Sequence, residues 1–116
     1  MRAPEFVDAI RTVVLEPTIK SLVSLLCAPP GRRPLAELVE LSDWYKALSE
    51  RDKAMVERLL GMAVRHAVFG VFEVLDGALK VDPSATAKDY FELRHVHGGS
   101  EDILSGPRGM LLHELL

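Results

Sequence analysis

Cysteine is nearly absent from this sequence, since Cys27 is the only one in 116 residues. One cysteine excludes a disulfide within the chain, and the lack of disulfides is typical of proteins from a reducing compartment. Cys27 follows two leucines in an apolar run, where a free cysteine usually behaves as a small buried hydrophobe. We therefore expect a cytoplasmic protein in which this thiol is buried and unreactive.

Long apolar runs are also missing. No stretch reaches the roughly 18 consecutive apolar residues that a membrane-spanning helix needs. The first residues do not resemble a secretory signal peptide, because Glu5, Asp8, Arg11 and Glu16 interrupt any apolar segment there. We expect no leader and no membrane partner.

Positive charge is in deficit, with a formal net charge of -3. Nonspecific nucleic-acid binding depends on a concentrated basic surface, so we expect no nucleic-acid partner. The one adjacent basic pair, Arg32 and Arg33, lies in a loop rich in proline, where such residues usually face solvent. The modestly acidic remainder suits a basic protein partner, although many soluble proteins share this charge.

Catalytic motifs are absent as well. The sequence has no phosphate-binding glycine loop, no G-x-S-x-G turn and no cysteine–histidine pairing at a known spacing. We therefore predict no catalytic residue and no cofactor.

The segment from Leu48 to Gly77 is the longest one with a single helical period, and it predicts a helix over about 49–76. Ser49 and Asp52 fit a capping box at its start, and Gly77 fits a left-handed residue at its end. Its second half is apolar on every side and needs cover all round. A main apolar stripe is widened by five further residues, which are Met55, Leu59, Met62, Phe69 and Phe72.

Two glycines, Gly61 and Gly70, lie inside this helix, where each costs about 1 kcal/mol relative to alanine. Close approach of a neighbouring helix explains both, and a kink at Gly70 is the alternative.

Two further helices are predicted, over about 4–27 and 35–48, separated by a loop at 28–34. Pro17 predicts either a kink or the start of a new helix, because proline removes a backbone hydrogen bond and clashes with the preceding turn. Trp44, the only tryptophan, is interpreted as a core anchor in preference to an interface residue.

The C-terminal part contains a strand pattern. Paired glycines at Gly98 and Gly99 predict a tight turn, and therefore an antiparallel hairpin over about 90–105 that buries Ile103 or Leu104. A hairpin alone is marginal in water, so we expect it to pack on the long helix or to gain a third strand from 79–82. Residues 110–116 predict a short amphipathic helix that packs on the body or on a second subunit.

These patterns predict an α+β protein that is mainly α and forms one domain over residues 1–116. We expect a bundle of three to four helices around the long central helix, with the small β-hairpin at the C-terminal end.

Four stretches carry a resemblance to known proteins: LSERDK, VFGVFEVLDG, YFELRHV and LHELL. Together they cover the C-terminal 70 residues or so, and their pattern resembles small uncharacterised bacterial proteins of an immunity-protein-like kind. The resemblance implies a helical first half, a short β-containing tail and a role in binding and silencing a toxin. It implies no catalytic residue.

Histidines offer one metal-binding alternative. His95 and His97 share a face of a regular strand, and two imidazoles ligate zinc when further ligands arrive. The residues that could supply the third and fourth ligands do not have the spacing of a metal site along the chain; they are His66, His113, Glu92 and Asp102. The sequence therefore favours exposed or interfacial histidines that carry no metal, and leaves metal binding by His95 and His97 open.

The leading hypothesis is a noncatalytic protein-binding domain, with an immunity or antitoxin-like role as its specific form. The residues predicted to contact a partner protein are Phe69, Phe72, Glu73, Asp76, His95 and His97. Asp76 is included because a carboxylate at the negative end of a helix dipole is locally unfavourable, which points either to a basic partner or to a cap for the following turn. The alternatives are a small metal- or ligand-binding enzyme-like domain that uses the hairpin histidines, and a structural homodimer subunit.

Overall fold

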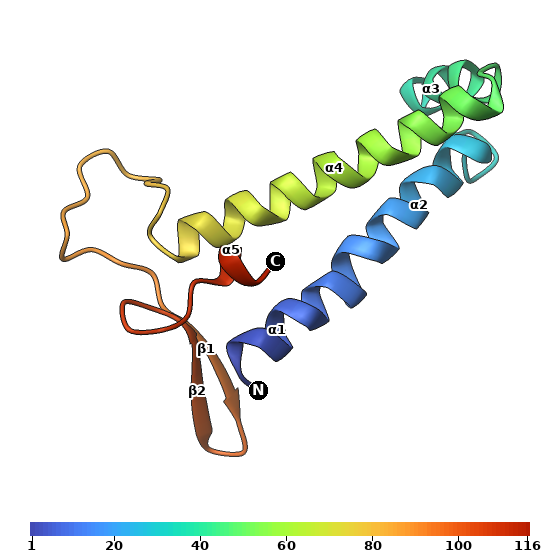
Figure 1. Ribbon diagram of the computed structural model, residues 1–116. Helices are drawn as coiled ribbons and strands as arrows, with labels where there is room; N and C mark the ends of the chain where they lie inside the picture. Colours follow the sequence, from blue (N-terminus) through green and yellow to red (C-terminus); the bar gives the residue numbers. More distant parts are fainter. The chain divides into compact units, whose positions relative to one another are not determined.

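The computed structural model describes residues 1–116, of which 57% are helical. The elements in chain order are α1 (Ala3–Ile10), the π-helix η1 (Arg11–Leu15), α2 (Glu16–Cys27), α3 (Ala36–Lys46), α4 (Glu50–Leu75), β1 (Leu93–His97), β2 (Ser100–Ser105) and α5 (Leu112–Leu115) (Figure 1). The predicted fold class is confirmed: the chain is α+β and mainly α, with one long helix and a C-terminal antiparallel hairpin.

Contacts group the chain into two compact units. We call residues Met1–Val13 together with His66–Leu116 the terminal unit, and Val14–Arg65 the central unit. The sequence predicts one domain around one core, whereas the cluster of mutually packed buried residues lies wholly in the terminal unit. Helix α4 contributes its first sixteen residues to the central unit and its last ten to the terminal unit.

The helix around Pro17 resolves the two sequence alternatives. The π-helix η1 lies directly before α2, and α2 begins with Glu16 and Pro17 in its first turn, where the missing proline N–H needs no partner. A π-helix has a wider turn than an α-helix, and it relieves the clash between a proline ring and the carbonyl four residues earlier. Leu15 has helical φ and ψ angles, so the helical backbone continues into α2, and Pro17 is accommodated by the π-helical turn before it without a break in the chain.

Both predicted ends of α4 are present. The Ser49 hydroxyl accepts the backbone N–H of Asp52 at 3.1 Å, although the reciprocal bond from the backbone of Ser49 to the Asp52 carboxylate is absent. At the other end Gly77 has a φ of +79°, and its N–H donates to the Val74 carbonyl at 3.1 Å. The N–H of Ala78 donates to the Glu73 carbonyl at 2.8 Å, which completes a Schellman motif.

Helix α4 is continuous through both of its internal glycines. A Cβ added at Gly61 would lie 3.7 Å from Cδ1 of Ile19, so close approach of α2 explains this glycine. A Cβ at Gly70 would meet nothing within 4 Å, so close approach does not explain this glycine, and the helix does not break there.

The central unit is held by α3. The Ser42 hydroxyl donates to the Leu26 carbonyl at 2.6 Å, and the buried Tyr45 donates its hydroxyl to a Glu57 carboxylate oxygen at 3.2 Å.

The prediction that Trp44 is a core anchor is wrong, because its side chain is 54% exposed. Adjacent helical residues point about 100° apart, and Tyr45 takes the buried side. The expectation that Cys27 is buried is also wrong, because this last residue of α2 is exposed.

The core of the terminal unit joins both ends of the chain. Four buried residues form it: Ala3, Val7, Phe72 and Leu112. The ring of Phe6 packs at a tilt on Phe72, with the centroids 6.2 Å apart. The predicted packing of the C-terminal leucines on the body is thus confirmed, although α5 is shorter than the expected 110–116.

The hairpin turns at the two predicted glycines, with φ angles of +53° at Gly98 and +80° at Gly99. Strand β1 begins at Leu93, later than predicted, and pairs with β2 alone. Of the two expected supports for the hairpin, a third strand at 79–82 does not form, since these residues are bends and irregular loop. The hairpin instead contacts the end of α4, where the Ser105 hydroxyl donates to the Leu75 carbonyl at 3.3 Å. Of the two expected buried residues, Leu104 is buried and Ile103 is exposed.

Replacing Phe72 by alanine should cost about 3–5 kcal/mol of unfolding free energy, because the residue is 3% exposed and truncation leaves a cavity among α1, α4 and α5. Urea denaturation followed by circular dichroism measures this loss. Val71→Ala, at an exposed site one residue away, should change stability by less than about 0.5 kcal/mol. Equal losses in the two variants would refute this core assignment.

Candidate functional site

The six residues predicted to contact a partner do not form one surface. Phe72 is buried in the terminal core, and the Asp76 side chain is only 1% exposed. Phe69 is at the surface and places its ring edge-on against His113, with centroids 5.4 Å apart. Glu73 is half-buried on α4. The two remaining residues, His95 and His97, lie together on β1.

Asp76 is the centre of a buried hydrogen-bond network. Its Oδ2 accepts the backbone N–H of His113 at 2.9 Å and lies 2.7 Å from Nδ1 of the same residue. Its Oδ1 accepts the Ser105 hydroxyl at 3.1 Å. Asp76 therefore caps α5, 37 residues further along the chain, which neither sequence interpretation anticipated.

The network contains serine, histidine and aspartate but does not form a catalytic triad. In a triad the histidine stands between the other two and takes the serine proton. Here the carboxylate of Asp76 stands in the middle, and the hydroxyl of Ser105 donates to it. Ser105 is also fully buried, so no substrate can reach it. The network is structural.

The pKa of Asp76 is lowered by its surroundings. Burial is the largest single effect and raises the pKa, because it disfavours the charged form. Hydrogen bonds from the backbone N–H groups of His113 and Leu112, and from the His113 ring and the Ser105 hydroxyl, together outweigh burial. The ionised carboxylate is therefore the form that stabilises the fold.

A second cluster lies on the hairpin. His95, His97 and Asp102 each offer one ligand atom, and these atoms lie within 4.8 Å of one another. Sequence reasoning named both histidines and included Asp102 only among several additional ligands. The pairing of β1 with β2 brings this aspartate to the histidines, because it lies directly opposite His95.

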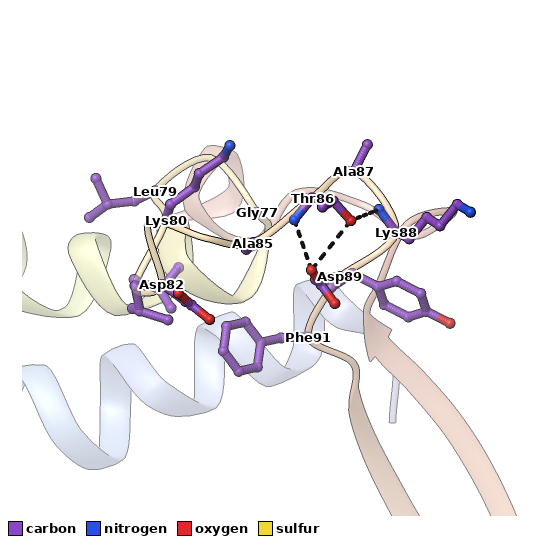
Figure 2. Close-up of a pocket in the computed structure, with 13 residues that line it drawn as sticks. Gly77, Leu79, Lys80, Asp82, Ala85, Thr86, Ala87, Lys88, Asp89 and Phe91 are labelled. Carbon is purple, nitrogen blue, oxygen red and sulfur yellow. Dashed lines mark hydrogen bonds between the residues drawn. The ribbon is translucent and has the colours of Figure 1, made fainter.

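A pocket of about 690 Å³ opens in the loop between α4 and β1 (Figure 2). Its two carboxylates serve the loop itself: Asp82 accepts the N–H of Ser84 at 2.9 Å, and Asp89 accepts the N–H of Thr86 at 2.8 Å. Figure 2 shows the amino group of Lys88 directed away from the pocket. No charged groups converge on this space, so it offers no evident chemistry.

An exposed apolar row lies on the part of α4 that belongs to the central unit. Met55, Leu59 and Met62 follow spacings of four and three, which place them on one helix face, and they are 52%, 60% and 52% exposed. We call these three residues the α4 row. The expectation that they widen a buried stripe is wrong, because the half-buried side of this helix is the opposite one, with Leu60 and Val64.

Three arginines flank the α4 row on one side at intervals of seven residues: Arg51, Arg58 and Arg65. All three are exposed, and Nη1 of Arg58 lies 3.7 Å from the sulfur of Met55. The seven-residue spacing of these arginines is visible in the sequence and could have identified this exposed face of α4. No helix of the structure is both long enough and apolar enough to cross a membrane.

Asp76→Asn should destabilise the protein at pH 7 by about 1–3 kcal/mol, since the amide keeps the shape but leaves buried partners poorly satisfied. The native Asp76 pKa is lowered, so its contribution is present above the unfolded pKa of about 3.9 and is lost as the pH falls through the native value. The difference between wild type and variant should therefore shrink below about pH 3.9. Thermal unfolding between neutral and acidic pH measures it.

The control is Asp43→Asn, at an exposed carboxylate whose side chain makes no hydrogen bond. This variant should follow wild type at every pH. A difference between wild type and Asp76→Asn that stays constant with pH would contradict the role of the ionised carboxylate.

Comparison of the chain with protein-family models, with curated proteins and with solved structures finds no match in any of the three.

Proposed function

We propose that this chain is a noncatalytic, cytoplasmic protein-binding domain. The observation that carries the proposal is the α4 row, in which three large apolar side chains lie exposed and consecutive on one helix face. Contiguous exposed apolar surface is unfavourable in water and is typical of sites that bind another protein. Anchors at positions i, i+4 and i+7 match the spacing by which two helices pack together.

The chemistry of the row favours a helical partner. Two of its three residues are methionines, whose flexible and polarisable side chains adapt to varied apolar surfaces. The arginines at positions 51, 58 and 65 add positive charge along one flank. The opposite flank carries one carboxylate, Asp52, in the first turn of α4. A partner helix with an apolar stripe and acidic residues beside it fits both features.

The same arginines argue against a second copy of the chain as the occupant. Two identical helices that pack antiparallel through one face bring the same flank of each helix together. The three arginines of one copy would then face those of the other, and like charges oppose that arrangement. An antiparallel homodimer through this face is therefore disfavoured.

The specific form of the proposal is an immunity or antitoxin-like protein, whose partner is a toxin that it silences. This form is supported by the resemblance of LSERDK, VFGVFEVLDG, YFELRHV and LHELL to small bacterial proteins of that kind. It agrees with the lack of a catalytic constellation in the sequence.

Two synthetic helical peptides test the proposal. They share one apolar stripe, and one carries glutamates beside it where the other carries lysines. Fluorescence anisotropy should show binding of the glutamate peptide alone. Leu59→Glu should weaken that binding roughly thirtyfold, the equivalent of losing an interface residue worth about 2 kcal/mol.

The matched control is Val71→Glu, which places the same charge at another exposed apolar site on α4 and should bind like wild type. Equal affinity for both peptides, or no effect of Leu59→Glu, would refute the proposed surface. Sedimentation that shows a dimer abolished by Leu59→Glu would also overturn it, in favour of self-association.

A further inference from the structure

The hairpin places three metal-binding side chains on one face. His95 and His97 are two residues apart on β1 and therefore project to the same side of the strand. Their rings stack with centroids 4.8 Å apart and an interplanar angle of 25°. Asp102 of β2 lies opposite His95 in the register, so its side chain shares that face.

The spacing of the donor atoms suits a single transition-metal ion. In a tetrahedral zinc site with bonds of about 2.0–2.1 Å, two donor atoms lie roughly 3.3 Å apart. Nε2 of His97 and Oδ2 of Asp102 already have this separation, 3.3 Å. All three donors lie within 4.8 Å of one another, and His97 is half exposed, so small side-chain rotations complete the approach.

One ring nitrogen of His95 lacks any partner. Nδ1 of His95 is buried and makes no hydrogen bond within the chain. A buried polar atom without a partner is costly, and the great majority of such atoms in proteins have one. Coordination to a metal ion satisfies a neutral imidazole nitrogen, and it fixes the ring by the same contact.

Asp102 supplies the negative charge of the cluster. The Asp102 carboxylate accepts hydrogen bonds from the Met1 amino group at 2.8 Å and from His97. The nearest guanidinium on β1, that of Arg94, is held by Glu92 and by Glu101 and does not neutralise Asp102. The Met1 amino group is thus the one positive group that a metal ion must displace from Oδ2.

We propose that His95, His97 and Asp102 bind one divalent transition-metal ion of the zinc type. Two imidazoles and one carboxylate are a ligand set that zinc accepts, and three protein ligands leave one coordination position for water. This inference does not depend on the α4 row, because none of its residues belongs to that surface.

Isothermal titration of the purified chain with zinc chloride tests the site. Wild type should bind one equivalent of zinc. His97→Ala and Asp102→Asn should each weaken binding at least about tenfold, the smallest loss usual for removing even an outer partner of a metal ligand.

His66→Ala provides the matched control, since it removes an exposed histidine from α4 and should leave the zinc affinity unchanged. Circular dichroism verifies that each variant is folded. Chemical shifts of the His95 and His97 ring protons give a second readout that requires both residues to respond to zinc.

Two results would overturn the proposal. One is the absence of zinc binding by wild type up to about 1 mM, the level of weak nonspecific affinity. The other is binding that survives in both His97→Ala and Asp102→Asn, which would place the ion elsewhere on the chain.

Discussion

The terminal unit depends on one buried carboxylate, that of Asp76. Its two oxygens join the end of α4 to β2 through Ser105 and to α5 through His113. The helix α5 has only four residues and no side-chain cap of its own, so the bond from Asp76 supplies the acceptor that its first turn lacks. Once α5 is held there, Leu112 fills the core beside Phe72. The hydrogen bond from His113 to Asp76 therefore positions Leu112 for its contact with the core.

Helix α4 serves two environments along one length. Between positions 66 and 75 one side of the helix packs in the terminal core, where Phe72 is buried. Val71 is exposed on another side, so the expectation that this half is covered all round is wrong. Between positions 50 and 65 it packs on one side only, and its opposite side exposes the α4 row. Within the central unit, only α2 and α3 are available to cover this first half of α4, and each is shorter than α4. The exposed row follows from that shortage of covering material.

Local rules account for the parts of the fold that the sequence predicts correctly. The Ser49 cap, the Schellman glycine at position 77 and the turn at Gly98 and Gly99 each depend on residues within a few positions. The packing of the C-terminal leucines was also predictable, because a leucine-rich end is unfavourable when it is exposed to water. The caps and the turn need no knowledge of long-range contacts.

The errors share a different cause. Periodicity shows that Met55 and Leu60 are apolar, but it does not decide which of two apolar faces receives a neighbour. Of the adjacent aromatic residues Trp44 and Tyr45, only Tyr45 is buried, and the position of the neighbouring helices determines which of the two it is. The bond from His113 to Asp76 spans 37 residues, so no local pattern reports it.

The hairpin cluster combines both kinds of information. Alternation along β1 placed His95 and His97 on one face from sequence alone, whereas Asp102 joined them only through the strand register. Two-stranded hairpins are marginal in water, and this one is supported mainly at its base, where Ser105 is bound to α4. A metal ion held by both strands would crosslink the hairpin near its turn, where the polypeptide supplies little apolar contact. The site would therefore order the part of the terminal unit that Asp76 does not reach.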